Sequence, residues 1–209
     1  RRLLLGSLAV ELVLRLDDLL DLEVGLEDAV QDDVLGELVR PRLDHHHRRL
    51  ARFGELIGWP RKGEASNDIY LTAYNSGTNA AALGILWDDL APIDLLEARE
   101  GRDGFFWLGP KGTLTPWHHD LTNNLLVQVI GRKRVRMAPP WAFARMKNSR
   151  HCFSDWGNEA LPAGEGDAAM PPVLETTIGP GEAIFLPVGW WHQVEALDLS
   201  AGMGFTNFW

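Results

Sequence analysis

Two histidines and one aspartate in this sequence have the residue types and spacing of a mononuclear metal site. His118 and Asp120 are separated by one residue, and His192 follows much later in the chain. Two imidazoles and one carboxylate can hold one face of a non-heme Fe(II) ion and leave the opposite face open. Open neighbouring positions are what an enzyme needs to bind a cosubstrate and O2 together. The three residues therefore predict a metal centre for oxidative chemistry.

The residue between the first two, His119, is a competing ligand. Side chains in a strand alternate between its faces, so His118 and Asp120 point the same way and His119 points the opposite way. We therefore select His118 as the ligand and assign no role to His119.

The same alternation singles out a lysine. In the run Arg132–Met137 the three arginines share one face, whereas Lys133 shares the other face with Val135 and Met137. A lone lysine aimed into an apolar interior is costly unless an anion meets it, and a dicarboxylate cosubstrate is such an anion. A side chain that reaches back to solvent, or one paired with a buried acid, is the alternative. Alternation leaves these equal, and the nearby His-x-Asp motif favours the cosubstrate.

Strands must position these residues. From about residue 67 the chain breaks into short strand-like runs divided by Gly and Pro. Many short strands with turn signals between them favour a sandwich or barrel over a parallel sheet. We therefore expect a mainly β fold, with strands at 68–74, 105–108, 125–130, 132–137, 183–186 and 201–208.

Two further segments are predicted around this frame. Residues 141–172 are rich in Pro and Gly and predict a long insert between the two halves of the sheet, as part of a substrate entrance. Residues 1–57 predict a helical region, because leucines recur at helical spacing from Leu5 to Leu19. That apolar stripe packs on its own barrel or forms a homodimer interface, and the sequence leaves both open. The expected division is thus 1–57 and 58–209.

Composition narrows the classes of partner. The 209-residue chain has a formal net charge of −9, which argues against a nucleic-acid partner, since phosphate binding needs a basic face. The lone Cys152 excludes an intrachain disulfide and fits a reducing cytoplasm. The first apolar run is interrupted by Glu11 and Arg15 and is shorter than the roughly 20 residues of a membrane span. We therefore expect no membrane anchor.

The candidate ligands belong to two longer patterns. These patterns are Gly112-x5-His118-x-Asp120-x3-Asn124-x6-Gly131 and Gly181-x5-Pro187-x-Gly189-x2-His192. Together they resemble the paired cupin motifs, with Asp120 at the usual second His and Asn124 at the usual Glu. The resemblance narrows to the jumonji-C group, the 2-oxoglutarate-dependent oxygenases, and within it to the asparaginyl and aspartyl protein hydroxylases and their bacterial cupin-like relatives. It runs from about Asn67 to Trp209.

This resemblance implies a double-stranded β-helix, the jelly roll or cupin barrel, behind the N-terminal helical region. It also implies a role for each matching residue. The matches are His118, Asp120 and His192 with the iron ligands; Lys133, Thr115 and Tyr70 with the groups that bind the distal carboxylate of 2-oxoglutarate; Asn124 and Asn207 with polar pocket residues; and Trp209 with an aromatic wall. Tyr70 as an ordinary core aromatic and Asn124 as a partner of the adjacent loop backbone are the alternatives.

The implied activity is hydroxylation of a side chain in a protein or peptide. Fe(II) is the implied metal, 2-oxoglutarate and O2 are the cosubstrates, and succinate and CO2 are released. The same chemistry on a small molecule, or demethylation of a methylated residue, is the alternative. Asp120 and Lys133 argue against a cupin that does not use 2-oxoglutarate. A non-catalytic cupin module for binding or assembly is a further alternative, although such a module has no physical need for a convergent triad.

Overall fold

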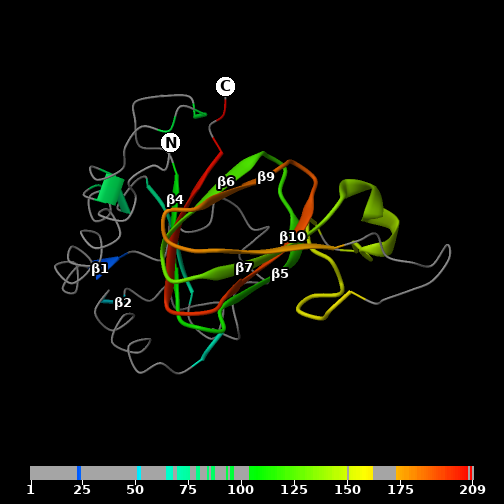
Figure 1. Ribbon diagram of the computed structural model, residues 1–209, viewed down its shortest axis with the longest axis horizontal. Helices are drawn as coiled ribbons and strands as arrows, with labels where there is room; N and C mark the ends of the chain where they lie inside the picture. Colours follow the sequence, from blue (N-terminus) through cyan, green and yellow to red (C-terminus); the bar gives the residue numbers. More distant parts are fainter. Residues whose placement is uncertain are drawn as a thin grey trace.

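Two antiparallel sheets form the body of the protein. The computed structural model describes residues 65–67, 70–75, 79–80, 84, 86–87, 93, 95–96, 104–149, 151–161, 173–206 and 208, with the backbone of 23–24 and 51–52. One sheet has the strand order β3-β4-β11-β6-β9 and the other β5-β10-β7-β8 (Figure 1). The five-stranded sheet comprises β3 (Leu71–Tyr74), β4 (Phe105–Gly109), β11 (Ser200–Phe205), β6 (Asn124–Ile130) and β9 (Ala183–Leu186). The four-stranded sheet comprises β5 (Leu114–His119), β10 (Trp191–Ala196), β7 (Lys133–Ala138) and β8 (Leu174–Ile178).

Successive strands cross between the sheets. From β4 to β7, and again from β8 to β11, each strand lies in the sheet opposite to its predecessor. This exchange is typical of a jelly roll, in which both sheets contribute to one enclosed interior. The expected mainly β, two-sheet architecture is confirmed.

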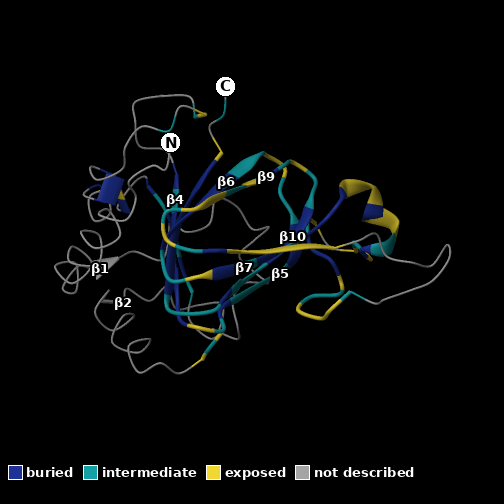
Figure 2. Ribbon diagram, in the orientation of Figure 1, coloured by how far each residue is buried: buried dark blue, intermediate teal, exposed yellow. Residues whose placement is uncertain are grey.

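The faces of the sheets pack into three apolar clusters, and the buried strands stand out in Figure 2. Alternation along β6 divides its side chains between two of them. Leu126 joins Val135 and Met137 in the interior between the sheets. Val127 packs on the other face of the five-stranded sheet, in a cluster that includes Leu86 and Trp87. The interior also contains buried polar side chains, so it is only partly apolar.

The third cluster covers the outer face of the four-stranded sheet. Trp117 and Trp191 turn away from the interior and pack against Ala142 of the 3-10 helix η4 (Pro140–Arg145). The Trp156 indole N–H donates to the Arg145 carbonyl at 2.9 Å, which ties the following turns to η4. The described part of the expected insert thus forms a packed cover over this sheet, and residues 162–172 lie outside the described residues.

In the N-terminal region the structure describes the backbone of four residues. β1 (Glu23–Val24) pairs with β2 (Ala51–Arg52) in an antiparallel ladder. The helical expectation for 1–57 is wrong at these positions, because pairing between distant segments is a long-range contact that helical periodicity does not report. The leucine stripe itself lies outside the described residues. No helix among the described residues is long and apolar enough to cross a bilayer.

Candidate metal centre and cosubstrate pocket

Three potential ligand side chains converge at one end of the β5–β10 ladder. His118 of β5 and His192 of β10 are cross-strand partners, and Asp120 directly follows β5. His118 Nε2 lies 3.8 Å from Asp120 Oδ1, and His192 Nε2 lies 3.6 Å from Asp120 Oδ2. Ligand atoms of the three residues all lie within 4.8 Å of one another. The structure therefore brings together the three residues that the sequence singled out.

Both imidazoles are oriented by the backbone. His118 Nδ1 lies 2.8 Å from the Pro116 carbonyl, and His192 Nδ1 lies 3.0 Å from the Trp190 carbonyl. A carbonyl only accepts, so each Nδ1 carries the hydrogen and each Nε2 keeps its lone pair for the site. Burial, reinforced by the neighbouring His118, lowers the pKa of His192 to about 4. His192 is therefore a neutral ligand at physiological pH.

The carboxylate of Asp120 is held by an amide. Asn124 Nδ2 donates to Asp120 Oδ2 at 3.3 Å. Burial alone would raise the pKa of Asp120, but His118 and His192, with the Asn124 hydrogen bond, lower it below its ordinary value. Asn124 Oδ1 is buried without a hydrogen-bond partner among the described residues, which leaves an acceptor in the pocket. Two imidazoles and an ionised carboxylate are a donor set that fits Fe(II).

Lys133 lies in the interior, as its alternation predicts. Its side chain is 3% exposed, whereas the two arginines that follow on β7 are turned outward to ion pairs with Glu195 and Glu175. Burial lowers the pKa of Lys133 to about 8. No carboxylate among the described residues pairs with it. A buried ammonium without an acid is costly, so an anion that paired with Lys133 would stabilise it.

Thr115 reaches the same interior through a bulge. The β5–β10 register shifts between His192 and Val194, and beyond the shift Thr115 pairs with Val194, the neighbour of Val135 on β7. Cross-strand partners share a face, so Thr115 lies on the inner face of the sheet. Its row of cross-strand pairs is next to the row that contains Lys133. Tyr70 is the residue before β3 of the other sheet, and its side chain is hydrogen-bonded to Thr115. Burial raises the pKa of Tyr70 and keeps its hydroxyl protonated, although this hydrogen bond opposes the shift.

The sequence reasoning missed the small residues that make room in this interior. On β11, a Cβ at Gly204 would lie 3.0 Å from Trp107 Nε1, and one at Gly202 would lie 3.4 Å from Lys133 Nζ. Alternating glycines in an otherwise apolar strand were the available signal, since glycine in a strand marks a close approach. Gln128, which faces the same space, was also missed. Asn207 and Trp209 lie outside the described residues.

The fold is of the cupin type, and its His118, Asp120 and His192 could hold a metal ion. Residues 27–209 match the profile of the cupin-like domain family, and the chain belongs to that family. The match begins well before Asn67, where the recognised motifs begin, and so includes part of the segment that the sequence analysis had set apart.

Curated relatives extend this relationship. The chain is 34% identical over 108 residues to lysine-specific demethylase JMJ30 of Arabidopsis thaliana, covering 47% of this chain and 24% of that protein. It is 34% identical over 107 residues to Jumonji C domain-containing protein 5 of Drosophila melanogaster, covering 47% and 26%. The chain therefore spans about a quarter of the length of these relatives. The expected relationship to the jumonji-C proteins is confirmed.

A solved structure is also similar over about half of this chain. It is that of YcfD, a ribosomal oxygenase from Escherichia coli in complex with cobalt and 2-oxoglutarate, with a TM-score of 0.34 and 17% identity. The similarity covers 49% of this chain and 22% of that one.

Proposed function

We propose that this chain is an Fe(II)- and 2-oxoglutarate-dependent oxygenase that hydroxylates a side chain of a protein or peptide. The observation that carries the proposal is the combination of the convergent triad with a buried, acid-free Lys133. A triad alone suits many metal-dependent reactions. An interior ammonium in the same barrel adds a need for an anion, and a dicarboxylate that chelates the metal with its other end meets both needs.

Different residues would bind the metal and the distal carboxylate of 2-oxoglutarate. His118, Asp120 and His192 would hold Fe(II), and Asn124 would keep the Asp120 carboxylate in its orientation. A metal ion held there with 2-oxoglutarate would supply the oxidation of a substrate C–H bond by O2, with release of succinate and CO2. Lys133 would bind the distal carboxylate through a charge-assisted hydrogen bond, and the linked hydroxyls of Thr115 and Tyr70 would complete its shell. The apolar interior residues exclude water around this contact, which strengthens it.

Demethylation is the second candidate, because several relatives are named lysine-specific demethylases. Both outcomes begin with the same hydroxylation of a C–H bond. On a side-chain carbon the alcohol is stable, whereas on an N-methyl group the product releases formaldehyde. The substrate therefore decides between the two activities, and a small-molecule substrate would be a third outcome of the same chemistry.

The setting of the reaction is also part of the proposal. The lone Cys152 and the net charge of −9 fit a protein of the cytoplasm with no nucleic-acid partner. Dimerisation through residues 1–57 stays a prediction, because the leucine stripe lies outside the described residues.

Succinate release is the first test. The parent chain, loaded with Fe(II) without air, is mixed with 2-oxoglutarate and then exposed to O2, with and without a mixed peptide library. We expect succinate that depends on Fe(II) and rises with a peptide substrate. Mass spectrometry of that peptide then separates a gain of one oxygen atom from the loss of a methyl group with formaldehyde.

Two pairs of variants control this test. Asp120→Ala removes a ligand, and Asp155→Ala removes an exposed carboxylate elsewhere. Lys133→Met removes the interior cation, and Lys111→Met removes an exposed one. Only the first member of each pair should lose succinate release at limiting 2-oxoglutarate. A parent chain that neither releases succinate nor is stabilised against heat by metal with 2-oxoglutarate would refute the oxygenase and favour a non-catalytic cupin module.

A further inference from the structure

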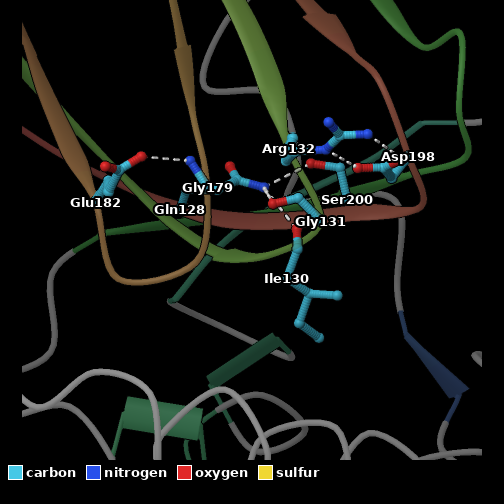
Figure 3. Close-up of polar contacts among 8 residues, drawn as sticks. All are labelled: Gln128, Ile130, Gly131, Arg132, Gly179, Glu182, Asp198 and Ser200. Carbon is cyan, nitrogen blue, oxygen red and sulfur yellow. Dashed lines mark hydrogen bonds and ion pairs between the residues drawn. The ribbon is translucent and has the colours of Figure 1, made fainter.

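Gln128 on β6 has a side-chain amide whose orientation is fixed. The residue is 1% exposed, and Figure 3 shows its amide nitrogen surrounded by acceptors. Nε2 donates to the Ile130 carbonyl at 2.6 Å, to the Gly131 carbonyl at 3.2 Å and to Ser200 Oγ at 2.8 Å. Two of these three are backbone carbonyls, which only accept, so the amide cannot flip. Oε1 is therefore fixed on the side opposite to these acceptors.

That oxygen is an unused acceptor. Gln128 Oε1 is buried and has no hydrogen-bond partner among the described residues. Leaving a buried carbonyl unsatisfied costs free energy, and such groups normally have a partner or wait for one. A donor of hydrogen bonds is therefore missing at this point of the interior.

The interior ammonium lies at the same place. Gly202 of β11 is the direct cross-strand partner of Gln128. A Cβ at Gly202 would lie 3.1 Å from Gln128 Oε1 and 3.4 Å from Lys133 Nζ. An acceptor from one sheet and a cation from the other thus both lie beside one glycine. Oε1 has no hydrogen-bond partner, and Lys133 has no ion-pair partner, among the described residues.

We propose that Gln128 is the positioning residue of Lys133: its Oε1 accepts a hydrogen bond from the ammonium through one water and keeps the cation beside Gly202. The inference rests on the proposed function only for the identity of the anion that Lys133 then binds. The contact satisfies the amide oxygen and stabilises the charged form of the lysine.

The position of Oε1 also sets the direction from which an anion can arrive. A carbonyl oxygen repels a carboxylate, so the Gln128 side of Lys133 is closed to the distal carboxylate. The anion must use the remaining N–H groups of the ammonium. The carboxylates of the strands that flank β7 do not compete, because Glu175 and Glu195 are bound outward by Arg136 and Arg134.

The first test measures the ionisation of Lys133 without any cosubstrate. Protein labelled at the lysine side chains has four reporters, Lys62, Lys111, Lys133 and Lys147, and Lys133→Met identifies the signal of interest. We expect Gln128→Met to lower the pKa of Lys133 and Gln128→Glu to raise it, because one variant removes the acceptor and the other adds a negative charge. Ser200→Ala, which loses one partner of Nε2 and keeps Oε1, is the control and should give a smaller shift than either.

The second test measures binding of 2-oxoglutarate to Co(II)-loaded protein in the absence of O2. Gln128→Met should weaken this binding roughly tenfold at about pH 8, the loss expected for one hydrogen bond to a charged group. Binding of 2-oxobutyrate, which has the chelating end and no distal carboxylate, should be unchanged.

The outcomes separate the two proposals. A Lys133 pKa that is the same in the parent, Gln128→Met and Gln128→Glu chains overturns the positioning role, and opposite shifts in the two variants support it even if one of them is less stable. The two variants can also shift the Lys133 pKa in opposite directions while the parent chain does not bind 2-oxoglutarate. That result supports the positioning of Lys133 and overturns the proposed function. Equal loss of 2-oxoglutarate and 2-oxobutyrate binding means a general distortion of the pocket and overturns the positioning role.

Discussion

His118 and His192 face each other across the β5–β10 ladder, with ring centroids 4.1 Å apart. Backbone hydrogen bonds of the ladder fix this pair before any metal binds, and each ring is fixed again through Nδ1. His119, the next residue, points to the other side of the sheet. There it packs edge-on against Trp191, with ring centroids 4.7 Å apart. The two adjacent histidines therefore have different surroundings, and mutation can separate them.

Replacement of His118 should remove the metal, whereas replacement of His119 should not. We expect His118→Ala to lower the affinity for Co(II) by more than roughly 100-fold, since even an outer partner of a ligand is worth 10- to 100-fold. His119→Ala should keep metal binding and lose some stability through its contact with Trp191. Isothermal titration with Co(II) and thermal unfolding measure the two effects. Equal metal loss in both variants would contradict the face assignment.

Asn124 should contribute to metal binding through Asp120. Asn124→Ala deletes the 3.3 Å hydrogen bond to Asp120 Oδ2, so we expect metal affinity to fall by roughly 10- to 100-fold. Asn123→Ala is the matched control, because Asn123 Oδ1 accepts from the Val188 N–H at 3.0 Å and does not hold a ligand. Competition with a chelator gives both affinities. A normal affinity in Asn124→Ala would show that the carboxylate is held by the metal alone.

Lys133 should lower the stability of the metal-free protein. Its pKa is about 8 in the fold against 10.5 for an ordinary lysine, so the unfolded chain binds more protons between these pH values. Stability from this group therefore rises as pH increases from about 8 to about 10.5, and the full cost of the charge is present below about pH 8. We expect Lys133→Met to raise the free energy of unfolding by about 1 to 3 kcal/mol at neutral pH. Urea unfolding across pH measures it, and a gain that persists unchanged at high pH would contradict the explanation.

The affinity for 2-oxoglutarate should depend on the charge of the same lysine. Above about pH 8 the lysine of the free protein loses its proton, and binding of the distal carboxylate then requires proton uptake. We expect the affinity of the parent chain to fall by up to about tenfold per pH unit above that value, whereas Lys133→Met binds weakly with a flat profile. Isothermal titration in buffers of different ionisation enthalpy detects the proton taken up. A flat profile in the parent chain would mean that another group binds the carboxylate.

The arginines on the outer face of β7 should matter little by comparison. Arg136 Nε lies 2.7 Å from Glu175 Oε2, in a pair whose acid is half exposed. Exposed ion pairs contribute about 0 to 1 kcal/mol, and Arg136 Nη1 also donates to the buried Gln193 Oε1 at 2.9 Å, a hydrogen bond worth about 1 kcal/mol. Arg136→Met should therefore lower stability by no more than about 2 kcal/mol and leave 2-oxoglutarate binding intact. The same urea and titration experiments measure it. A loss of 2-oxoglutarate affinity would place Arg136, rather than Lys133, in contact with the pocket.

Features that depend on alternation along one strand were predictable from the sequence. Alternation within 132–137 placed Lys133 inside and the arginines outside, and the burial of β7 confirms it. Strand bounds at 183–186 were also correct. β8 was missed, because its residues Leu174–Thr177 are exposed and have no alternating pattern to detect.

Thr115 shows where alternation fails. It lies an odd number of residues before His118, so strict alternation puts the two on opposite faces. The register shift in the β5–β10 ladder places both inside. A bulge depends on how two strands pair, and a single strand's sequence carries no direct record of it.

The sequence by itself determined which residues could carry the proposed chemistry: His118, Asp120 and His192 as possible metal ligands, and Lys133 as a cation directed inward. These follow from residue type and local period, which each segment carries alone. Only the tertiary structure decided what surrounds them. The Thr115–Tyr70 hydrogen bond joins β5 to the residue before β3. Gln128 and Lys133 both lie beside Gly202 because β6, β7 and β11 lie together in the folded barrel. Such contacts arise from the pairing of distant strands, which local periodicity does not encode.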